Sequence, residues 1–220
     1  MAQARDFQMT DTLDIIRLNT ELIPGTSTAE LWRNVPVFDQ FALYWNRDEA
    51  LPYTSVQLFH NDRQLAFRFV AHENDTVVLD GPLKDKMDVI QECRVEIFMQ
   101  AEPDMARYYC LEMDPKGRVL DYQASYYRTF QRQWQCPKLQ LLGRKTPDGY
   151  EVEGTLELDI LRQLGILTAD NTMRAGLYRA AFRHGTDGNV IQRWISWINP
   201  NTLEPDFHVP TSLGTLRLQN

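Results

Sequence analysis

The sequence predicts an all-β fold: a single antiparallel β-sandwich of immunoglobulin-like or jelly-roll-like type, with about ten strands and one or two short helices. Short runs alternate apolar and polar side chains with a period of two, which is typical of strands buried on one face. Turn-forming sequences such as Thr146-Pro147-Asp148-Gly149 separate these runs, and helical periodicity is almost absent. With 220 residues and 43% hydrophobic residues, the chain can bury one large core.

Each expected element follows from a local pattern. Pro36 restricts the irregular early segment to an edge, whereas Asp159 and Gly165 suit the start and stop of a short helix. The expected elements are a helical turn or strand at 11–19, an irregular segment at 31–41, a short helix at 159–165, and strands at 55–60, 64–72, 94–100, 107–114, 118–123, 139–145, 150–158, 173–183, 193–198 and 213–218. No linker or repeat divides them. We expect residues 1–31 to be an N-terminal extension packed on one domain that spans residues 32–220.

The central hairpins, residues 94–123, organise the rest of the prediction. One face is expected to be core, and it holds Val95, Ile97, Met99, Tyr109, Leu111, Met113, Leu120 and Tyr122. The other face is expected to be solvated, and it holds Arg94, Glu96, Phe98, Tyr108, Cys110, Glu112 and Asp121. The register places Glu96 nearly opposite Glu112, and such like charges destabilise a sheet unless an arginine, a cation or a ligand lies between them. We expect that arginine to be Arg94 or Arg174.

Charge and cysteine content exclude several classes of partner. The formal net charge of −7 and the absence of a basic block argue against nucleic acid and anionic membranes as partners. Three cysteines do not make a disulfide framework. The first residues resemble no signal peptide, and no run reaches the ~18 apolar residues of a membrane span. We therefore expect a soluble, cytoplasmic protein, or a secreted one if a leader has been removed; the oligomeric state is left open.

Several motifs resemble one known family. The strand pair ECRVEIF and RYYCLEMDPKG, the segments GYEVEGTLELDIL and MRAGLYR, and above all the closing SWINPNTLEPDFHVPTSLGTLRL resemble carbohydrate-binding module family 9-like proteins. Leu213 and Gly176 depart from that family's usual Phe and Asn. The resemblance implies a β-sandwich of the wider DOMON-like group, which binds sugars or haem. It also implies a sugar-chain end held between Trp rings above polar side chains, and in several members structural calcium.

The resemblance and the residues together predict a carbohydrate site. Sugar rings bind through aromatic faces and through planar polar groups that hydrogen-bond to hydroxyls. The expected carbohydrate-binding residues are Trp45, Arg94, Glu96, Glu112, Tyr126, Trp134, Arg174, Trp197 and Asn199. For Trp197 two roles stay open, a sugar-stacking residue and a core residue. His208, in Pro-Asp-Phe-His-Val-Pro, is expected to bond to backbone within a fixed turn.

Three alternatives to a non-catalytic sugar-binding domain stay open. A structural or interaction module without a working sugar site is the main one. A glycoside hydrolase would need paired carboxylates such as Glu96 and Glu112, but no catalytic motif marks either of them. Haem ligation would need Met87 or Met99 with His60, His72 or His208, and no spacing supports it. Calcium is left open too, because the acidic loops at 73–75 and 85–88 have no fixed calcium-loop spacing.

Overall fold

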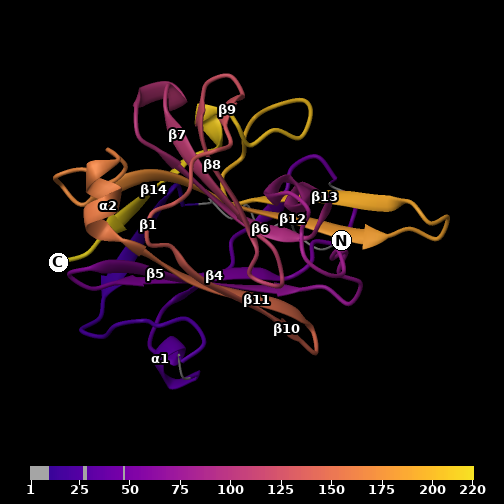
Figure 1. Ribbon diagram of the computed structural model, residues 1–220, viewed down its shortest axis with the longest axis horizontal. Coiled ribbons are helices and arrows are strands. Elements are labelled where there is room, and N and C mark those ends of the chain that lie inside the picture. The colour runs from indigo at the N-terminus through magenta and orange to yellow at the C-terminus, as the bar shows by residue number, and fades with distance from the viewer. Residues whose placement is uncertain (1–9, 27–28, 47) are drawn as a thin grey trace, which may run out of the picture.

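The fold is all-β, as predicted. A computed structural model describes residues 10–26, 29–46 and 48–220 (Figure 1). Its strands are β1 Thr12–Arg17, β2 Val37–Phe38, β3 Ala42–Leu43, β4 Thr54–His60, β5 Gln64–His72, β6 Arg94–Gln100, β7 Tyr108–Met113, β8 Val119–Ser125, β9 Thr129–Gln131, β10 Gln140–Thr146, β11 Gly149–Glu157, β12 Thr172–His184, β13 Val190–Ser196 and β14 Gly214–Leu218. Its helices are short: α1 Ala29–Arg33, α2 Leu158–Gln163, and the 3-10 helices η1 Lys86–Gln91, η2 Pro103–Met105 and η3 Pro210–Ser212. No described helix is long and apolar enough to cross a membrane.

The strands join into one curled, mixed sheet rather than the antiparallel sandwich of about ten strands that the sequence predicts. Within the described residues, fourteen strands are hydrogen-bonded in the order β10-β11-β5-β4-β1-β14-β12-β6-β7-β8-β9, with β13, β2 and β3 attached at the sides. The difference arises at β1, which pairs in parallel with both β14 and β4 and so connects the two halves of the sheet.

The segment expected to be an N-terminal extension contributes a strand to the sheet. Residues 12–17 form β1, which lies between β4 and β14. Residues 1–9 and 27–28, which belong to the same expected extension, lie outside the residues that the structure describes. Between these segments, Leu22 is 1% exposed, and its backbone N–H donates to Gln64 Oε1 at 2.7 Å.

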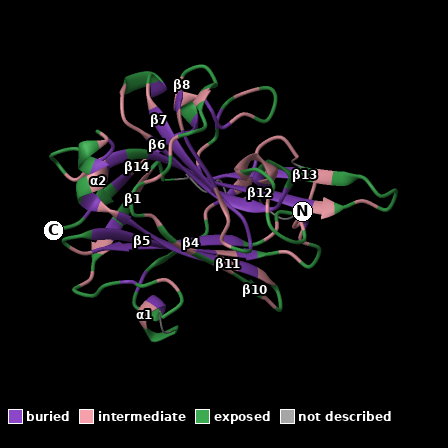
Figure 2. Ribbon diagram, in the orientation of Figure 1, coloured by how far each residue is buried: buried purple, intermediate pink, exposed green. Residues whose placement is uncertain are grey.

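One hydrophobic core lies between the two halves of the sheet (Figure 2). Val95, Ile97 and Leu111 on one half, and Val152 and Leu156 on the other, are all buried in the same cluster. The first three are among the residues predicted to form the core, and for them the prediction is confirmed. Alternation located them because each strand turns only one face toward the other half.

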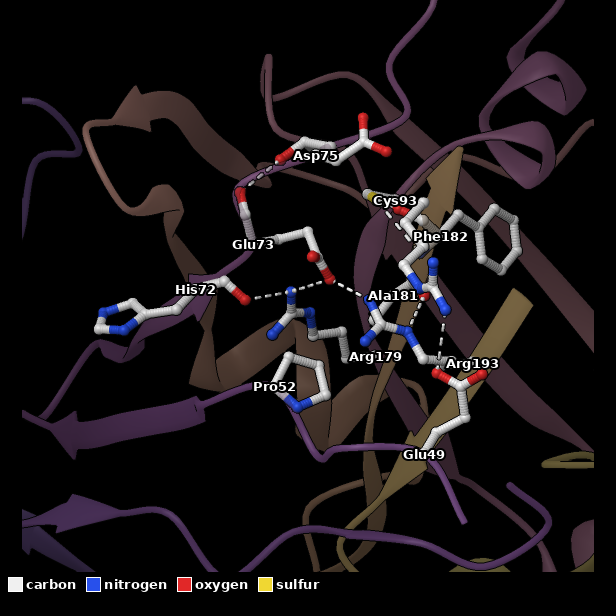
Figure 3. A network of polar contacts seen from close by, with 12 residues as sticks. Glu49, Pro52, His72, Glu73, Asp75, Cys93, Arg179, Ala181, Phe182 and Arg193 are labelled. Carbon is white, nitrogen blue, oxygen red and sulfur yellow. Dashed lines mark hydrogen bonds and ion pairs between the residues drawn. The ribbon is translucent and has the colours of Figure 1, made fainter. Parts of the chain in front are cut away.

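A buried network of charged groups also ties the two halves together (Figure 3). Arg179 of β12 is completely buried, and it donates to the backbone carbonyl oxygens of Tyr53 at 2.8 Å and His72 at 2.9 Å. The Glu73 carboxylate lies between Arg179 and Arg193 and pairs with both. Because every charged member has a partner, these groups are tolerated in the interior.

The register of the central hairpins is partly as predicted. Glu96 of β6 pairs directly with Glu112 of β7, as expected. On β8, however, Leu120 pairs with Glu112, so Leu120 and Tyr122 lie on the face opposite to the predicted one. Asp121 is displaced in the same way and pairs with Leu111.

The cause is one additional residue in the second turn. Asp114 donates its N–H to the carbonyl of Arg118, so the loop holds three residues, with Gly117 at φ +77°. The predicted four-residue turn would have paired Asp114 with Gly117. A slip of one residue exchanges the faces of a strand, and that is what happens on β8.

Candidate functional site

The face predicted to be solvated is buried under loops and encloses a cavity. Arg94, Glu96 and Glu112 on this face are each 5% exposed or less. A cavity of about 420 Å³ lies over them, lined by β6, β7 and β8 below and by η1, β13, the β9 segment and residues 205–208 around it. The expectation that this sheet face is solvated is therefore wrong, because later loops of the chain fold back over it.

The floor of the cavity is a cluster of two carboxyl groups around one arginine. Arg94 donates its Nε–H to Glu112 Oε2 at 2.6 Å, and Tyr122 donates its hydroxyl to Glu112 Oε1 at 2.8 Å. Both Glu112 oxygens thus have donors, the arrangement of an ionised carboxylate. The expectation that an arginine shares the environment of Glu96 and Glu112 is confirmed, and that arginine is Arg94.

Glu96 is the incompletely satisfied member of this cluster. Its Oε1 lies 2.9 Å from Arg94 Nε, but that nitrogen carries a single hydrogen, which points to Glu112. The Oε1 atom is buried and accepts no hydrogen bond. Burial raises the pKa of the Glu96 carboxyl to about 8, and the neighbouring charge of Glu112 acts in the same direction. At neutral pH the floor therefore holds a neutral acid beside an ion pair.

Arg94 is fixed on every side. Its Nη1 donates to the backbone carbonyl oxygens of Ile90 at 3.1 Å and Glu92 at 3.2 Å. Its guanidinium carbon lies 5.4 Å from the ring centroid of Trp194 and 5.6 Å from that of Phe182. The rotamer of Arg94 is thereby held by strand, loop and ring contacts, so the floor is preorganised.

The cavity walls are aromatic. Trp194, Phe130 and Phe207 line it from three separate segments. Phe207 stacks on Tyr178 with ring centroids 4.2 Å apart and planes at 11°. The Tyr178 ring in turn lies over Gly176, where an added Cβ would come 1.8 Å from the Tyr178 hydroxyl. The glycine that departs from the family pattern is therefore what lets this supporting ring lie flat.

His208 closes one end of the cavity as a neutral ring. Its Nδ1 bonds to the Tyr108 hydroxyl at 2.9 Å, and its ring lies 4.9 Å from Phe98 and 5.4 Å from Phe130. Burial lowers the pKa of His208 to about 3, and the charge of Arg128 acts in the same direction. The expectation that His208 bonds to backbone is wrong for its ring, which bonds to a tyrosine.

Charged residues form the outer edge of the cavity. Arg128 pairs with Asp206 at 2.7 Å, and Tyr127 donates its hydroxyl to the same carboxylate at 2.6 Å. These contacts hold the pKa of Asp206 below its usual value even though burial acts against them. Arg132 also lines the cavity, with its guanidinium carbon 5.8 Å from the centroid of the Phe130 ring.

Three of the nine predicted site residues meet in this cavity: Arg94, Glu96 and Glu112. The three predicted stacking residues do not. Trp197 is completely buried and donates its indole N–H to the carbonyl of Thr10, so it is the core residue that the sequence left as its other alternative and has no free face for a sugar. Trp45 donates to the carbonyl of Thr202 and packs behind Phe207.

The other predicted residues also lie away from the cavity lining. Trp134 packs on Tyr109, which belongs to the core side of the sheet. Arg174 is exposed and donates to Leu213 and Thr215 of the closing strand region. Asn199 accepts from the backbone of Asn201 in a turn. Tyr126 is 53% exposed and contacts the ring of Tyr127.

The acidic loops considered for calcium use their carboxylates within the protein. Asp85 and Asp88 form a reciprocal cap on η1, Asp75 pairs with His184, and Glu73 pairs with two arginines. Among the described residues, no group of three or more His, Cys, Asp or Glu side chains is placed to hold a metal ion. Of the residues considered for haem, Met87 and His208 line the cavity, and Met99 lies in the core.

Sequence reasoning missed most of the wall. The missed lining residues are Met87, Ile90, Leu120, Tyr122, Arg128, Phe130, Arg132, Trp194, Pro205, Asp206, Phe207 and His208. Two signals were present: aromatics alternate with arginines at residues 126–134, and the closing motif fixes Phe207 between Asp206 and His208. Neither signal says which sheet face these segments cover, because that depends on contacts between distant parts of the chain.

The fold resembles solved carbohydrate-binding structures at low sequence identity. A candidate carbohydrate-binding protein from Bacteroides uniformis matches with a TM-score of 0.71 and 18% identity, over 94% of this chain and 99% of that one. A family 9 carbohydrate-binding module from Caldicellulosiruptor kristjanssonii, solved with glucose, matches with a TM-score of 0.58 and 13% identity, over 94% and 95% of the chains. The same module solved with cellotriose gives a TM-score of 0.59 and 13% identity, over 94% of each.

No curated protein matches the chain. The family model for the carbohydrate family 9 binding domain-like proteins matches residues 23–220, which is nearly the whole sequence. The match includes all the strands that form the cavity floor and every segment that lines its walls. The chain therefore belongs to the carbohydrate family 9 binding domain-like family.

Proposed function

We propose that the protein is a non-catalytic carbohydrate-binding domain that holds a mono- or oligosaccharide in the cavity above β6, β7 and β8. The observation that carries the proposal is the Glu96 carboxyl, 1% exposed, with an oxygen that lacks a hydrogen-bond partner at the floor of that cavity. A buried polar group with an incomplete set of partners is costly, and a ligand hydroxyl that bonds to the Glu96 carboxyl group would offset that cost.

The remaining lining has the chemistry that a sugar requires. A pyranose has an apolar C–H face and an edge of hydroxyl groups. Trp194 and Phe130 offer ring surfaces for the former, and Glu96 and the His208 ring offer polar atoms for the latter. The family membership and the two neighbouring structures, solved with glucose and with cellotriose, support the same ligand class.

The arrangement does not favour a glycoside hydrolase. Such an enzyme needs one carboxyl group on each side of the scissile bond. Glu96 and Glu112 are instead direct neighbours on adjacent strands, and both contact the same nitrogen of Arg94. Both carboxyl groups therefore lie on the same side of a ligand, and Glu112 is already paired with Arg94.

Calorimetric titration of the protein with glucose, cellotriose and a wider sugar panel tests the proposal. We expect dissociation constants between micromolar and millimolar, which correspond to ~4–8 kcal/mol. Glu96→Met should abolish binding while the protein stays folded, because an apolar residue of similar size removes the hydrogen bond but not the packing. Trp134→Phe, outside the cavity, is the matched control. An absence of heat for every sugar at millimolar concentration would refute the proposal, and Glu96-dependent turnover of an aryl glycoside would replace it with an enzyme.

A further inference from the structure

We infer that the preferred ligand is an acidic sugar, a hexuronate, whose carboxylate binds Arg132 at the edge of the cavity. This inference rests on the carbohydrate-binding function proposed above and specifies its ligand class. It starts from a property of Arg132 that no other described arginine shares.

Among the arginines that the structure describes, only Arg132 has no hydrogen bond or ion pair from its side chain to another described residue. Its neighbours on the cavity edge show the contrast, since Arg128 pairs with Asp206 at 2.7 Å. Even exposed arginines such as Arg17 and Arg217 have carboxylate partners at 2.5 and 2.6 Å. In a chain with 30 acidic and 23 basic residues, an arginine without any hydrogen-bond or ion-pair partner is notable, and this one lines the cavity.

The charges that line the cavity do not cancel. The lining contains three arginines and three acids, namely Arg94, Arg128, Arg132, Glu96, Glu112 and Asp206. The pKa of Glu96 is raised to about 8 by burial, so its carboxyl is mostly neutral at pH 7. Two ionised carboxylates then face three cations. The unbalanced positive charge belongs to Arg132, because the other two arginines are occupied.

The position of Arg132 suits a carboxylate attached to a sugar ring. A guanidinium presents parallel N–H donors that match the two oxygens of a carboxylate, and such charge-assisted pairs are stronger than neutral hydrogen bonds. Arg132 lies over the Phe130 ring, which itself lines the wall. A pyranose packed on that wall would bring a substituent of its ring to the guanidinium, while its hydroxyls reach Glu96 on the floor.

Matched sugar pairs test the inference. Each pair combines a uronate with its parent hexose, namely glucuronate with glucose and galacturonate with galactose. Titration of the wild type at pH 7 and low salt should show about tenfold tighter binding of the uronate in at least one pair. Arg132→Gln should reduce that preference to near one, because the uronate then loses the partner of its carboxylate. Arg33→Gln, on α1 at the opposite side of the molecule from β9 (Figure 1), is the control and should preserve the preference.

Each other outcome has a distinct meaning. Equal or tighter binding of the neutral hexose, or a uronate preference that survives Arg132→Gln, would overturn the inference while leaving carbohydrate binding intact. Tighter binding of glucose 6-sulfate than of glucuronate would overturn the carboxylate assignment in favour of a sulfated sugar. If no sugar of either kind binds the wild type, the proposed function itself fails.

Discussion

The buried carboxyl of Glu96 should make folding stability depend on pH in a direction opposite to that of most surface carboxylates. Its pKa is raised to about 8 in the folded protein, against about 4.5 when exposed. Below pH 4.5 both states are protonated, so the favourable contribution of the buried neutral acid is fully present. Between pH 4.5 and about 8 the unfolded chain releases the proton that the folded protein retains, so stability falls as pH rises.

Glu96→Gln isolates this effect because an amide has the shape of the protonated acid but does not titrate. One retained proton changes the free energy of unfolding by at most about 1.4 kcal/mol per pH unit. Between pH 5.5 and 7.5 the variant should therefore gain up to about 2–3 kcal/mol relative to the wild type. Urea unfolding at pH 5.5, 6.5 and 7.5, followed by tryptophan fluorescence, measures the difference.

The comparison with Glu112→Gln gives the control. Both oxygens of Glu112 accept hydrogen bonds, from Arg94 and Tyr122, so an amide nitrogen would face a donor and stability should fall at every pH. The raised pKa of Glu92, about 7 through burial, acts in the same direction as Glu96, but it is present in all the proteins compared and cancels. Parallel pH profiles for the wild type and Glu96→Gln would refute the assignment of a neutral buried acid.

Three further predictions concern the cavity floor, its closing ring and a close backbone contact. Arg94→Met should destabilise the protein by about 3–5 kcal/mol in urea unfolding, because it leaves buried carboxyls without a cation; a loss below 1 kcal/mol would contradict this. The pKa of His208 is about 3 in place of 6.5, so NMR spectra at pH 5 should show an unprotonated ring, and a protonated ring would contradict this. The free energy of unfolding should also fall as the pH drops below 6.5, because only the unfolded chain takes up the proton. Gly143→Ala should lower the melting temperature, since its Cβ would lie 2.2 Å from the backbone nitrogen of Gly117; an unchanged melting temperature would show that the contact can relax.

The floor of the site could be predicted from the sequence because it depends on local information. Strand alternation and a short turn place Glu96 opposite Glu112 within one hairpin, and electrostatics then requires a cation such as Arg94 nearby. On the next strand the same reasoning failed, because the turn after Asp114 holds one residue more than its composition indicates, and this moved Tyr122 onto the site face.

The walls of the site could not be predicted in the same way. Trp194 reaches the cavity because β13 pairs with β12, which pairs with β6, so its position depends on how this hairpin pairs with a strand distant in sequence. Phe207 arrives in a loop held by stacking on Tyr178. A tryptophan in a loop, such as Trp45, was therefore no better a candidate for the site than one in a strand.

The charged floor is difficult to explain as a structural device alone. Two carboxyl groups and a guanidinium buried beneath loops are generally no more stable than apolar residues of the same volume. The sheet face beside them shows that the chain can fill such positions with apolar groups, because Phe98 and Cys110 occupy neighbouring positions and are completely covered. A neutral Glu96 lowers the cost by leaving one ion pair instead of three charges, yet it also leaves a buried oxygen without a donor in the residue that lines the floor of the cavity. A buried ion pair beside a neutral acid with an incomplete set of hydrogen bonds is expected in a binding site whose polar ligand completes those bonds.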